Sequence, residues 1–381
     1  MIEILFLKNN NIRIKILSFI IFFLIPKCKI RNYSPEQYFN LCNNKKFLFK
    51  KKFKKVIKPK ISVICPIYNK ENYVLRFLRS VQNQHFISIE IILVDDCSKD
   101  NSRGVIEKYQ KEDERIILLK NRKNRGTFMS RNEGALYSKG DFLIFADPDD
   151  ILLCDILKYS FRTAKKGNYD IVRFNGYRNG KMMRYNFLNK NNRNSVYQPE
   201  LSLYAYYGLN GLYKFSQNDY YIWNKLIKRN IFISALNSIN EYYLNKYIID
   251  CEDGLMNFIL YRKAKSLYFM KYSGYFYIRN KKSITNRSNE NLIKRLSSNF
   301  LYFRFIFQYS KNNNIEKKIA DNIFLKIYFG IYNHKIIQFL KLVYSTNKLY
   351  EDVINMYLHS KFISLKTKNI MKFLKFSLKQ G

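Results

Sequence analysis

Residues 61–146 alternate short β-branched runs with stretches whose apolar residues recur at near-helical spacing. Strands are expected at 61–66, 89–94, 115–120 and 141–146. Helices are expected between them, at 69–84, 102–111 and 127–137. The strand runs are almost continuously apolar, which is typical of strands covered on both faces of a parallel sheet. Strands that alternate with helices form βαβ units, so the pattern predicts an α/β fold with a parallel sheet.

Acidic residues directly follow two of the expected strands. Asp95-Asp96 follows the second strand, and residues 147–150 (DPDD) follow the fourth. Open α/β sheets bind ligands at the carboxyl ends of their strands. Three carboxylates within four residues repel one another unless a cation is present, and Mg²⁺ or Mn²⁺ commonly bridges a few carboxylates to substrate phosphates. A solvated turn that caps the next helix is the alternative at both places, because aspartate favours turns and caps.

The composition restricts the class of protein. Apolar residues make up 47% and aromatic residues 17% of the 381-residue chain, so the chain can bury a large core and general disorder is excluded. The 68 basic and 29 acidic residues give a formal net charge of +39, which favours nucleic acid or an anionic membrane as a partner. An AT-rich genome, which encodes much Lys, Asn, Ile, Tyr and Phe, is the alternative cause of this charge. Only three histidines occur, so a histidine-rich zinc centre is excluded.

Both ends of the chain have features of a membrane-associated protein. The apolar run 16–25 is too short for a spanning helix, which needs about 20 residues, and is expected to be an uncleaved anchor or a signal-peptide core. A surface helix packed on the domain is the alternative. Lysines within 361–379 form a narrow stripe on an otherwise apolar helix, which suits an anionic membrane surface or, equally, docking on the protein. The expected location is membrane-associated and otherwise cytoplasmic.

Seven segments carry a resemblance to a known family. They are 62–69 (SVICPIYN), 80–84 (SVQNQ), 90–102 (EIILVDDCSKDNS), 124–126 (NRG), 130–134 (SRNEG), 140–150 (GDFLIFADPDD) and 250–254 (DCEDG). In this order, across residues 61–254, they resemble the family 2 glycosyltransferases. The resemblance implies the GT-A fold, in which a Rossmann-like nucleotide-binding half is joined to an acceptor half.

The resemblance also implies roles for several residues at the donor nucleotide. Pro66 and Tyr68 would lie beside the base, with the Tyr68 ring able to stack on uracil. Asp96 would hydrogen-bond the base. Arg131 lies in a segment that faces the nucleotide in the family and would meet its phosphates, and Asp147 would also lie at the nucleotide. The donor implied by the resemblance is a UDP-sugar.

A metal site and a catalytic base follow from the same resemblance. Asp147-x-Asp149 matches the metal-binding Asp-x-Asp motif, with Asp149 and Asp150 nearest to Mn²⁺ or Mg²⁺. Asp253 falls where the family places its general base, and the alternative for Glu252-Asp253 is an exposed turn before a helix. Family members invert the anomeric centre, so a single base that takes the acceptor hydroxyl proton suffices. The metal neutralises the charge that grows on the nucleoside diphosphate.

The chain departs from the family pattern at two positions. Cys97 stands where glycine commonly follows the Asp-Asp pair, and Pro148 stiffens the expected metal loop. Neither change is expected to inactivate the protein, since the fixed φ of proline is compatible with a turn. A later segment, 221–232 (YIWNKLIKRNIF), resembles bacterial capsule and lipopolysaccharide glycosyltransferases of this family. In it Trp223 is either a stacking platform for an acceptor sugar or a core aromatic, and Asn224 and Lys225 are candidate contacts to acceptor or diphosphate.

The expected organisation has four parts. They are an N-terminal hydrophobic segment with a lysine-rich linker (1–60), a nucleotide-sugar-binding half (61–160), an acceptor-binding half (161–290) and a helical, basic extension (291–381). The expected function is metal-dependent, inverting transfer of a sugar from a nucleoside-diphosphate sugar to a glycan or lipid-linked acceptor. The alternatives are a non-catalytic glycosyltransferase-like scaffold and a basic nucleic-acid-binding protein. No nucleic-acid-binding signature occurs in the sequence, so no specific nucleic acid partner is expected.

Overall fold

The computed structural model describes residues 53–153, 155–178, 181–183, 195–197, 221–244, 247–248 and 251–278, together with isolated positions between 298 and 309. The expected N-terminal anchor, most of the lysine-rich linker and the expected C-terminal lysine stripe lie outside the described residues. Within the described ranges, no helix combines the length and the apolar character that crossing a membrane requires.

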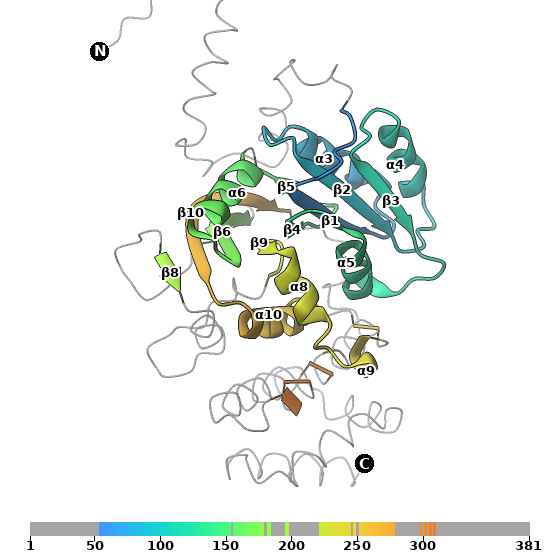
Figure 1. Cartoon of the computed structure of the whole chain (residues 1–381). Helices are drawn as coiled ribbons and strands as arrows, with labels where there is room; N and C mark the ends of the chain where they lie inside the picture. The colour runs from blue at the N-terminus through green and yellow to red at the C-terminus, as the bar shows by residue number, and fades with distance from the viewer. Residues whose placement is uncertain are drawn as a thin grey trace, which may run out of the picture.

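The first half of the described chain has the predicted βαβ order (Figure 1). Its strands, which pair in parallel in the spatial order β3-β2-β1-β4, are β1 (Ile61–Ile67), β2 (Ile89–Asp95), β3 (Ile116–Lys120) and β4 (Phe142–Phe145). The connecting helices are α3 (Glu71–Gln82), α4 (Ser102–Gln110) and α5 (Gly126–Tyr137). All of these elements begin and end within two residues of their predicted bounds. The predicted parallel α/β architecture is confirmed.

Beyond β4 the sheet becomes mixed. Strand β9 (Lys225–Lys228) pairs antiparallel with β4 and with β6 (Ile171–Arg178). Strand β10 (Leu267–Tyr277) runs parallel to β6 and antiparallel to β5 (Ile151–Leu152). Two short strands complete the described sheet, β7 (Lys181–Met183) beside β6 and β8 (Ser195–Tyr197) beside β10. The two expected halves therefore share one sheet, and β9 joins them.

The strands are continuously apolar because both faces of the sheet are covered. Side chains alternate along β1, so that Ile64 enters one hydrophobic core whereas Val63 and Cys65 enter the other. Helix α3 buries Val74, Phe77, Leu78 and Val81, the i, i+3, i+4 and i+7 positions of one helical face. That spacing is the signal from which the helix could be predicted.

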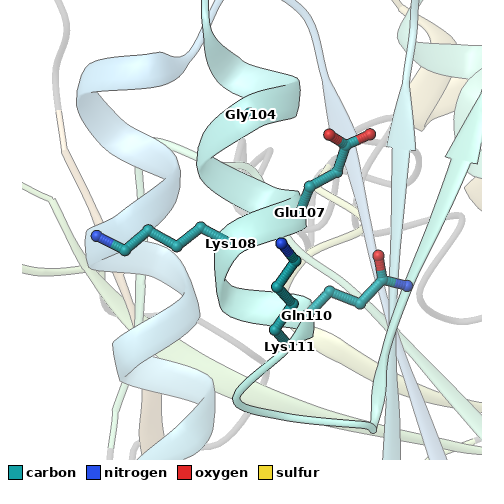
Figure 2. Close-up of a pocket in the computed structure, with 5 residues that line it drawn as sticks. All are labelled: Gly104, Glu107, Lys108, Gln110 and Lys111. Carbon is teal, nitrogen blue, oxygen red and sulfur yellow. The ribbon is translucent and has the colours of Figure 1, made fainter.

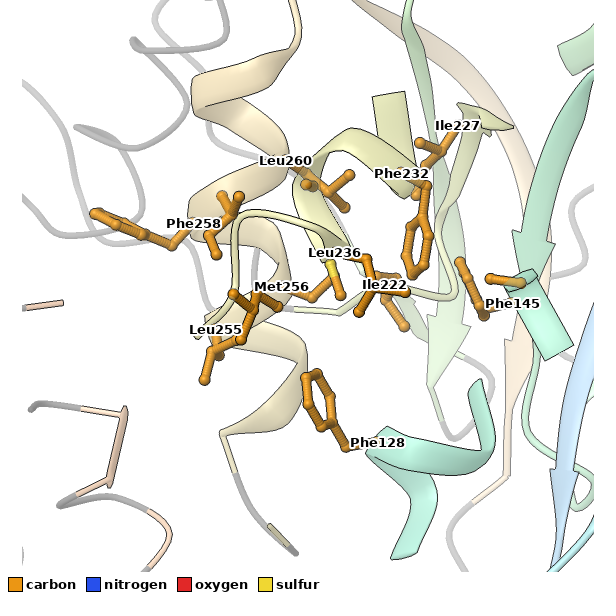
Figure 3. Packing of buried hydrophobic residues seen from close by; sticks show 14 of the residues in the cluster. Phe128, Phe145, Ile222, Ile227, Phe232, Leu236, Leu255, Met256, Phe258 and Leu260 are labelled. Atoms are coloured by element: carbon orange, nitrogen blue, oxygen red, sulfur yellow. The ribbon is translucent and has the colours of Figure 1, made fainter. Parts of the chain in front are cut away.

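Four further helices pack on the sheet or continue from it. They are α6 (Ile156–Gly167), α8 (Arg229–Leu236), α9 (Glu241–Leu244) and α10 (Glu252–Lys263). Figure 3 shows the core in which β4 meets α8 and α10, with the rings of Phe145 and Phe232 facing each other. Their ring centroids lie 4.8 Å apart. Through Arg131, the first turn of α10 is joined to Asp147, which follows the carboxyl end of β4.

Candidate functional site

The first acidic pair, at the end of β2, is held by protein groups on all sides. Asp95 is fully buried, and its Oδ2 accepts hydrogen bonds from Arg103 Nη2 at 2.6 Å and Nε at 3.1 Å. Its Oδ1 accepts a hydrogen bond from the Ser98 backbone N–H. Asp95 thus ties β2 to the start of α4 and has a structural role.

Asp96 organises the loop that leads into α5. Its Oδ1 accepts hydrogen bonds from Asn121 Nδ2 at 2.9 Å and from the Arg125 N–H at 2.8 Å, and its Oδ2 accepts one from the Gly126 N–H at 2.7 Å. The carboxylate therefore caps the N-terminus of α5, where free N–H groups need acceptors. It does not cap α4, the helix that follows Asp96 directly in the sequence. A contact of Asp96 with a nucleotide base stays a prediction. The neighbouring Cys97 has φ +64°, a left-handed conformation that explains why glycine suits this position.

The predicted base-binding residues at the end of β1 have different environments. Pro66 is buried within β1 opposite Val94, and its contact with the base stays a prediction. Tyr68 follows the strand and is 37% exposed, which leaves its ring accessible at the sheet edge. The next residue, Asn69, accepts a hydrogen bond from the Lys99 N–H at 2.8 Å and thereby joins the loops after β1 and β2.

The loop after β4 contains the three predicted metal-binding carboxylates. Asp147 Oδ1 accepts a hydrogen bond from Arg131 Nη2 at 2.8 Å. Asp149 Oδ2 accepts one from Lys70 Nζ at 2.8 Å, and both side chains are half-buried. Asp150 is 1% exposed; its Oδ1 accepts a hydrogen bond from the Ile278 N–H, and its Oδ2 has no hydrogen-bond partner among the described residues.

Burial and mutual repulsion make this loop electrostatically unfavourable. Burial, together with the charges of Asp149 and Asp147, raises the pKa of Asp150 well above its usual range. Burial also raises the pKa of Asp147, although the Arg131 guanidinium opposes the rise. Tyr275, whose hydroxyl accepts a hydrogen bond from the Asp147 N–H, has its pKa raised by burial and by the same carboxylates. The loop holds more negative charge than its protein partners neutralise.

A divalent cation fits this donor set. Mg²⁺ and Mn²⁺ prefer carboxylate oxygens, and Mg²⁺ is commonly held by one or two carboxylates together with substrate phosphates. Asp149 offers such an oxygen, and Oδ2 of Asp150 accepts no hydrogen bond from the described residues. In the described part of the chain, no group of three or more His, Cys, Asp or Glu side chains is arranged as a ready-made metal site.

The predicted general base lies in the first turn of α10. Asp253 is 8% exposed, and its Oδ1 accepts a hydrogen bond from Arg131 Nη1 at 2.5 Å. Its Oδ2 accepts one from the Ile222 N–H at 3.2 Å. The alternative of an exposed turn before the helix is wrong, because α10 begins at Glu252 and its first turn packs against the core.

Arg131 connects the Asp147 loop to this first turn. Besides its bonds to Asp147 and Asp253, its Nη1 lies 3.5 Å from Glu252 Oε1. Burial works against the charged guanidinium, but the carboxylates of Asp253, Asp147 and Glu252 outweigh it and raise the pKa of Arg131. Arg131 therefore stays positively charged. A contact between Arg131 and the donor phosphates was predicted from the sequence and stays a prediction.

The candidate acceptor residues on the later segment are buried. Trp223 is 1% exposed and stacks on Tyr275 and Tyr221, with ring centroids 4.3 Å and 5.0 Å apart. Trp223 is therefore a core aromatic and not an exposed stacking platform for an acceptor sugar. Asn224 and Lys225 are fully buried and bond each other, Lys225 Nζ donating to Asn224 Oδ1 at 2.8 Å. The hypothesis that these two contact acceptor or diphosphate is wrong for this structure, since neither is accessible.

Sequence reasoning missed several residues of the site. Lys70 and Arg76 both bind Asp149, Arg76 Nη2 donating to its backbone carbonyl at 2.7 Å. Lys70 directly follows the segment SVICPIYN, which was a usable signal. Tyr275 lies far away in the sequence and reaches the loop only because β10 pairs with β5. Nothing in its sequence context indicated this contact.

One pocket in the described part of the chain lies away from these residues. A surface hollow of about 570 Å³ lies on α4. Its lining residues, drawn in Figure 2, are Gly104, Glu107, Lys108, Gln110 and Lys111. All five residues are exposed or half-buried, and none belongs to the acidic site. We assign no function to this hollow.

Comparison with known proteins indicates the family that this chain resembles. Residues 62–235 match the family model for glycosyl transferase family 2. Over 110 residues the chain is 36% identical to a GalNAc(5)-diNAcBac-PP-undecaprenol beta-1,3-glucosyltransferase of Campylobacter jejuni, covering 29% of this chain and 36% of that protein. Over 93 residues it is 39% identical to the putative teichuronic acid biosynthesis glycosyltransferase TuaG of Bacillus subtilis, covering 24% and 37%. The chain thus spans less than two fifths of the length of these two relatives.

A third relative and a solved structure match over more of the chain. The chain is 25% identical over 266 residues to a processive diacylglycerol beta-glycosyltransferase of Mycoplasma pneumoniae, covering 69% of this chain and 75% of that protein. The crystal structure of S. aureus TarS 1–349 in complex with UDP-GlcNAc superposes with a TM-score of 0.61 at 17% identity, covering 84% of this chain and 88% of that chain. At so low an identity, the likeness to TarS is evidence for the fold alone and not for the function. By the family-model match residues 62–235 form a glycosyl transferase family 2 domain, and the order of its strands together with the likeness to TarS indicates the GT-A fold.

Proposed function

We propose that this protein is an inverting glycosyltransferase that transfers a sugar from a UDP-sugar to the hydroxyl of a glycan or lipid-linked acceptor. One observation carries the proposal. The carboxylates of Asp147, in the loop after β4, and of Asp253, which are far apart in the sequence, share a single buried guanidinium. A site that holds donor-binding and proton-accepting carboxylates this close together suits attack by an acceptor hydroxyl on a bound donor.

Each group of residues has a distinct task in this proposal. The exposed ring of Tyr68 stacks on the uracil, and Asp96 lies at the same sheet edge. Asp149 and Asp150, with Asp147 beside them, would hold Mn²⁺ or Mg²⁺. When bound, the cation supplies positive charge to the diphosphate leaving group. Asp253 takes the proton from the attacking hydroxyl, which requires a single base and no covalent intermediate.

The names of the relatives support the acceptor class. The Campylobacter relative is named for an undecaprenol-linked glycan and the Mycoplasma relative for diacylglycerol, so a lipid-linked acceptor at a membrane surface is consistent with both. The apolar run 16–25 and the lysine stripe at 361–379 are the proposed membrane contacts. Co-sedimentation of the full chain with vesicles containing anionic lipid, compared with neutral vesicles, tests this part.

Nucleotide release tests the activity. The full chain is incubated with UDP-, GDP- and dTDP-sugars in Mn²⁺, Mg²⁺ or EDTA, with and without an undecaprenyl-linked or diacylglycerol-linked acceptor. Release of UDP from one donor, abolished by EDTA and by Asp149→Ala, is the expected result. If no nucleotide is released and none binds in a metal-dependent way, the catalytic proposal fails and the non-catalytic scaffold takes its place.

A further inference from the structure

We propose that Arg131 is a positioning residue, which holds Asp253 and Asp147 at a fixed separation for transfer, and that it is not a ligand of the donor phosphates. This inference rests on the proposed function, because it assumes that Asp253 is the base. It goes further by assigning to the buried guanidinium a task different from the one that the family resemblance implies.

The hydrogen bonds of Arg131 are directed at the protein. Nη1 donates to Asp253 Oδ1 at 2.5 Å, and Nη2 donates to Asp147 Oδ1 at 2.8 Å. Nε has no hydrogen-bond partner among the described residues, but it is itself buried. With both terminal nitrogens engaged and Nε covered, the guanidinium presents little to a phosphate at the sheet edge.

The orientation of Asp253 depends on this contact. One carboxylate oxygen is held by Arg131 and the other by the Ile222 N–H, so the plane of the carboxylate is fixed from two sides. The planar guanidinium also sets the distance from Asp253 to Asp147, because its two terminal nitrogens lie at a fixed separation. Displacing a reacting group by about 1 Å can lower the rate on the order of 100-fold. A bridge that holds Asp253 in place therefore preserves the transfer rate.

A donor ligand and a positioning residue differ in their kinetic signatures. In the full chain, Arg131→Met is expected to lower kcat about 100-fold while the Kd for UDP with Mn²⁺ and the KM for the donor change less than about threefold. Arg131→Lys is expected to recover part of kcat, since lysine keeps the charge and loses the planar fork. A large rise in the Kd for UDP with kcat preserved would overturn the proposal, because it would make Arg131 a donor ligand.

Arg115 provides a matched control. It forms a buried two-point ion pair with Asp113, Nη2 to Oδ2 at 2.8 Å and Nε to Oδ1 at 2.9 Å, away from the acidic site. Arg115→Met is expected to lower the unfolding temperature and to leave kcat near the wild-type value. If it lowers kcat as much as Arg131→Met does, the effect of Arg131 is general destabilisation and the positioning role fails.

A second measurement does not depend on activity. Unfolding of the wild type, Arg131→Met, Asp253→Asn and the double variant forms a cycle in which paired residues give non-additive changes. Non-additive changes support the bridge, and additive changes overturn it. A wild type that transfers no sugar from any donor would contradict the proposed function, whereas the unfolding cycle would still decide whether Arg131 holds Asp253.

Discussion

Asp95-Asp96 and Asp149-Asp150 look alike in the sequence, since each pair follows an apolar parallel strand, but the structure surrounds them differently. Asp95 is paired with Arg103, and Asp96 accepts three hydrogen bonds. Asp149 pairs with one lysine, and Asp150 has one buried oxygen that accepts no hydrogen bond from the described residues, although the nearby Tyr275 hydroxyl favours the charged form of Asp150.

The two pairs differ in how many hydrogen-bond donors the protein supplies to their carboxylates. A buried carboxylate that the fold satisfies completely stabilises the fold, whereas one left short of donors costs free energy unless a ligand completes it. By this measure the pair after β2 is mainly part of the framework, and the loop after β4 is the place that a cation and a diphosphate would complete. The following variants test that distinction.

The largest effect is expected from Asp149→Asn. Removing this carboxylate takes away a proposed cation ligand, so the transfer rate should fall about 10³-fold, as when a group that stabilises transition-state charge is lost. The unfolding temperature should change little. Asp141→Asn is the control, because Asp141 forms an exposed ion pair with Lys60 outside the site. Wild-type transfer by Asp149→Asn would remove this loop from the mechanism.

Asp95→Asn should show the opposite pattern. It breaks a pair whose carboxylate is fully buried and whose arginine is partly exposed, so we expect a loss of about 2 kcal/mol in the free energy of unfolding. The variant should still transfer sugar, since the Asp95 carboxylate bonds only Arg103 and the Ser98 N–H, which are not part of the proposed site. Urea unfolding and the nucleotide-release assay measure the two quantities. An inactive variant of unchanged stability would show that both acidic pairs are functional.

Asp150→Asn should stabilise the metal-free protein, in a pH-dependent way. The pKa of Asp150 is raised in the folded state above the ordinary value of 3.8, so its contribution to stability is complete below that value and is lost as the pH rises through the folded-state pKa. Asparagine does not titrate. In EDTA its advantage should therefore be small near pH 4 and grow to about 1 kcal/mol at neutral pH. An advantage that is constant with pH would contradict the charge explanation.

Lys70→Gln should have the smallest effect, on cation affinity. The Lys70 ammonium bonds the same Asp149 oxygen that a divalent cation would use, so its removal should tighten Mn²⁺ binding about threefold in the absence of nucleotide. Electron paramagnetic resonance of free Mn²⁺ measures the binding. Lys120→Gln is the matched control, because Lys120 pairs with Glu107 away from the site. Equal effects of both variants would indicate a general change in net charge.

The elements of the donor half could be predicted because their signals are local. Apolar runs and helical spacing within about ten residues specified β1 to β4 and α3 to α5. The burial of later residues could not be predicted in this way. Trp223 is a core aromatic because it lies just before β9, which lies in the middle of the sheet, and the local sequence does not reveal where β9 lies. Glu252-Asp253 likewise begins a helix whose packing against α8 and β4 is a long-range contact.

The sequence by itself determined the parallel α/β half, the family and the presence of acidic loops after β2 and β4, because local periodicity and the order of short motifs carry that information. The tertiary structure alone decided which acidic pair is satisfied, since Arg103, Asn121 and Lys70 meet the carboxylates only where folding brings their helices and loops together. It also decided that Arg131 lies between Asp147 and Asp253. The physical reason is that the free energy of a buried charge depends on the donors around it in space, and a sequence places those donors only through the complete fold.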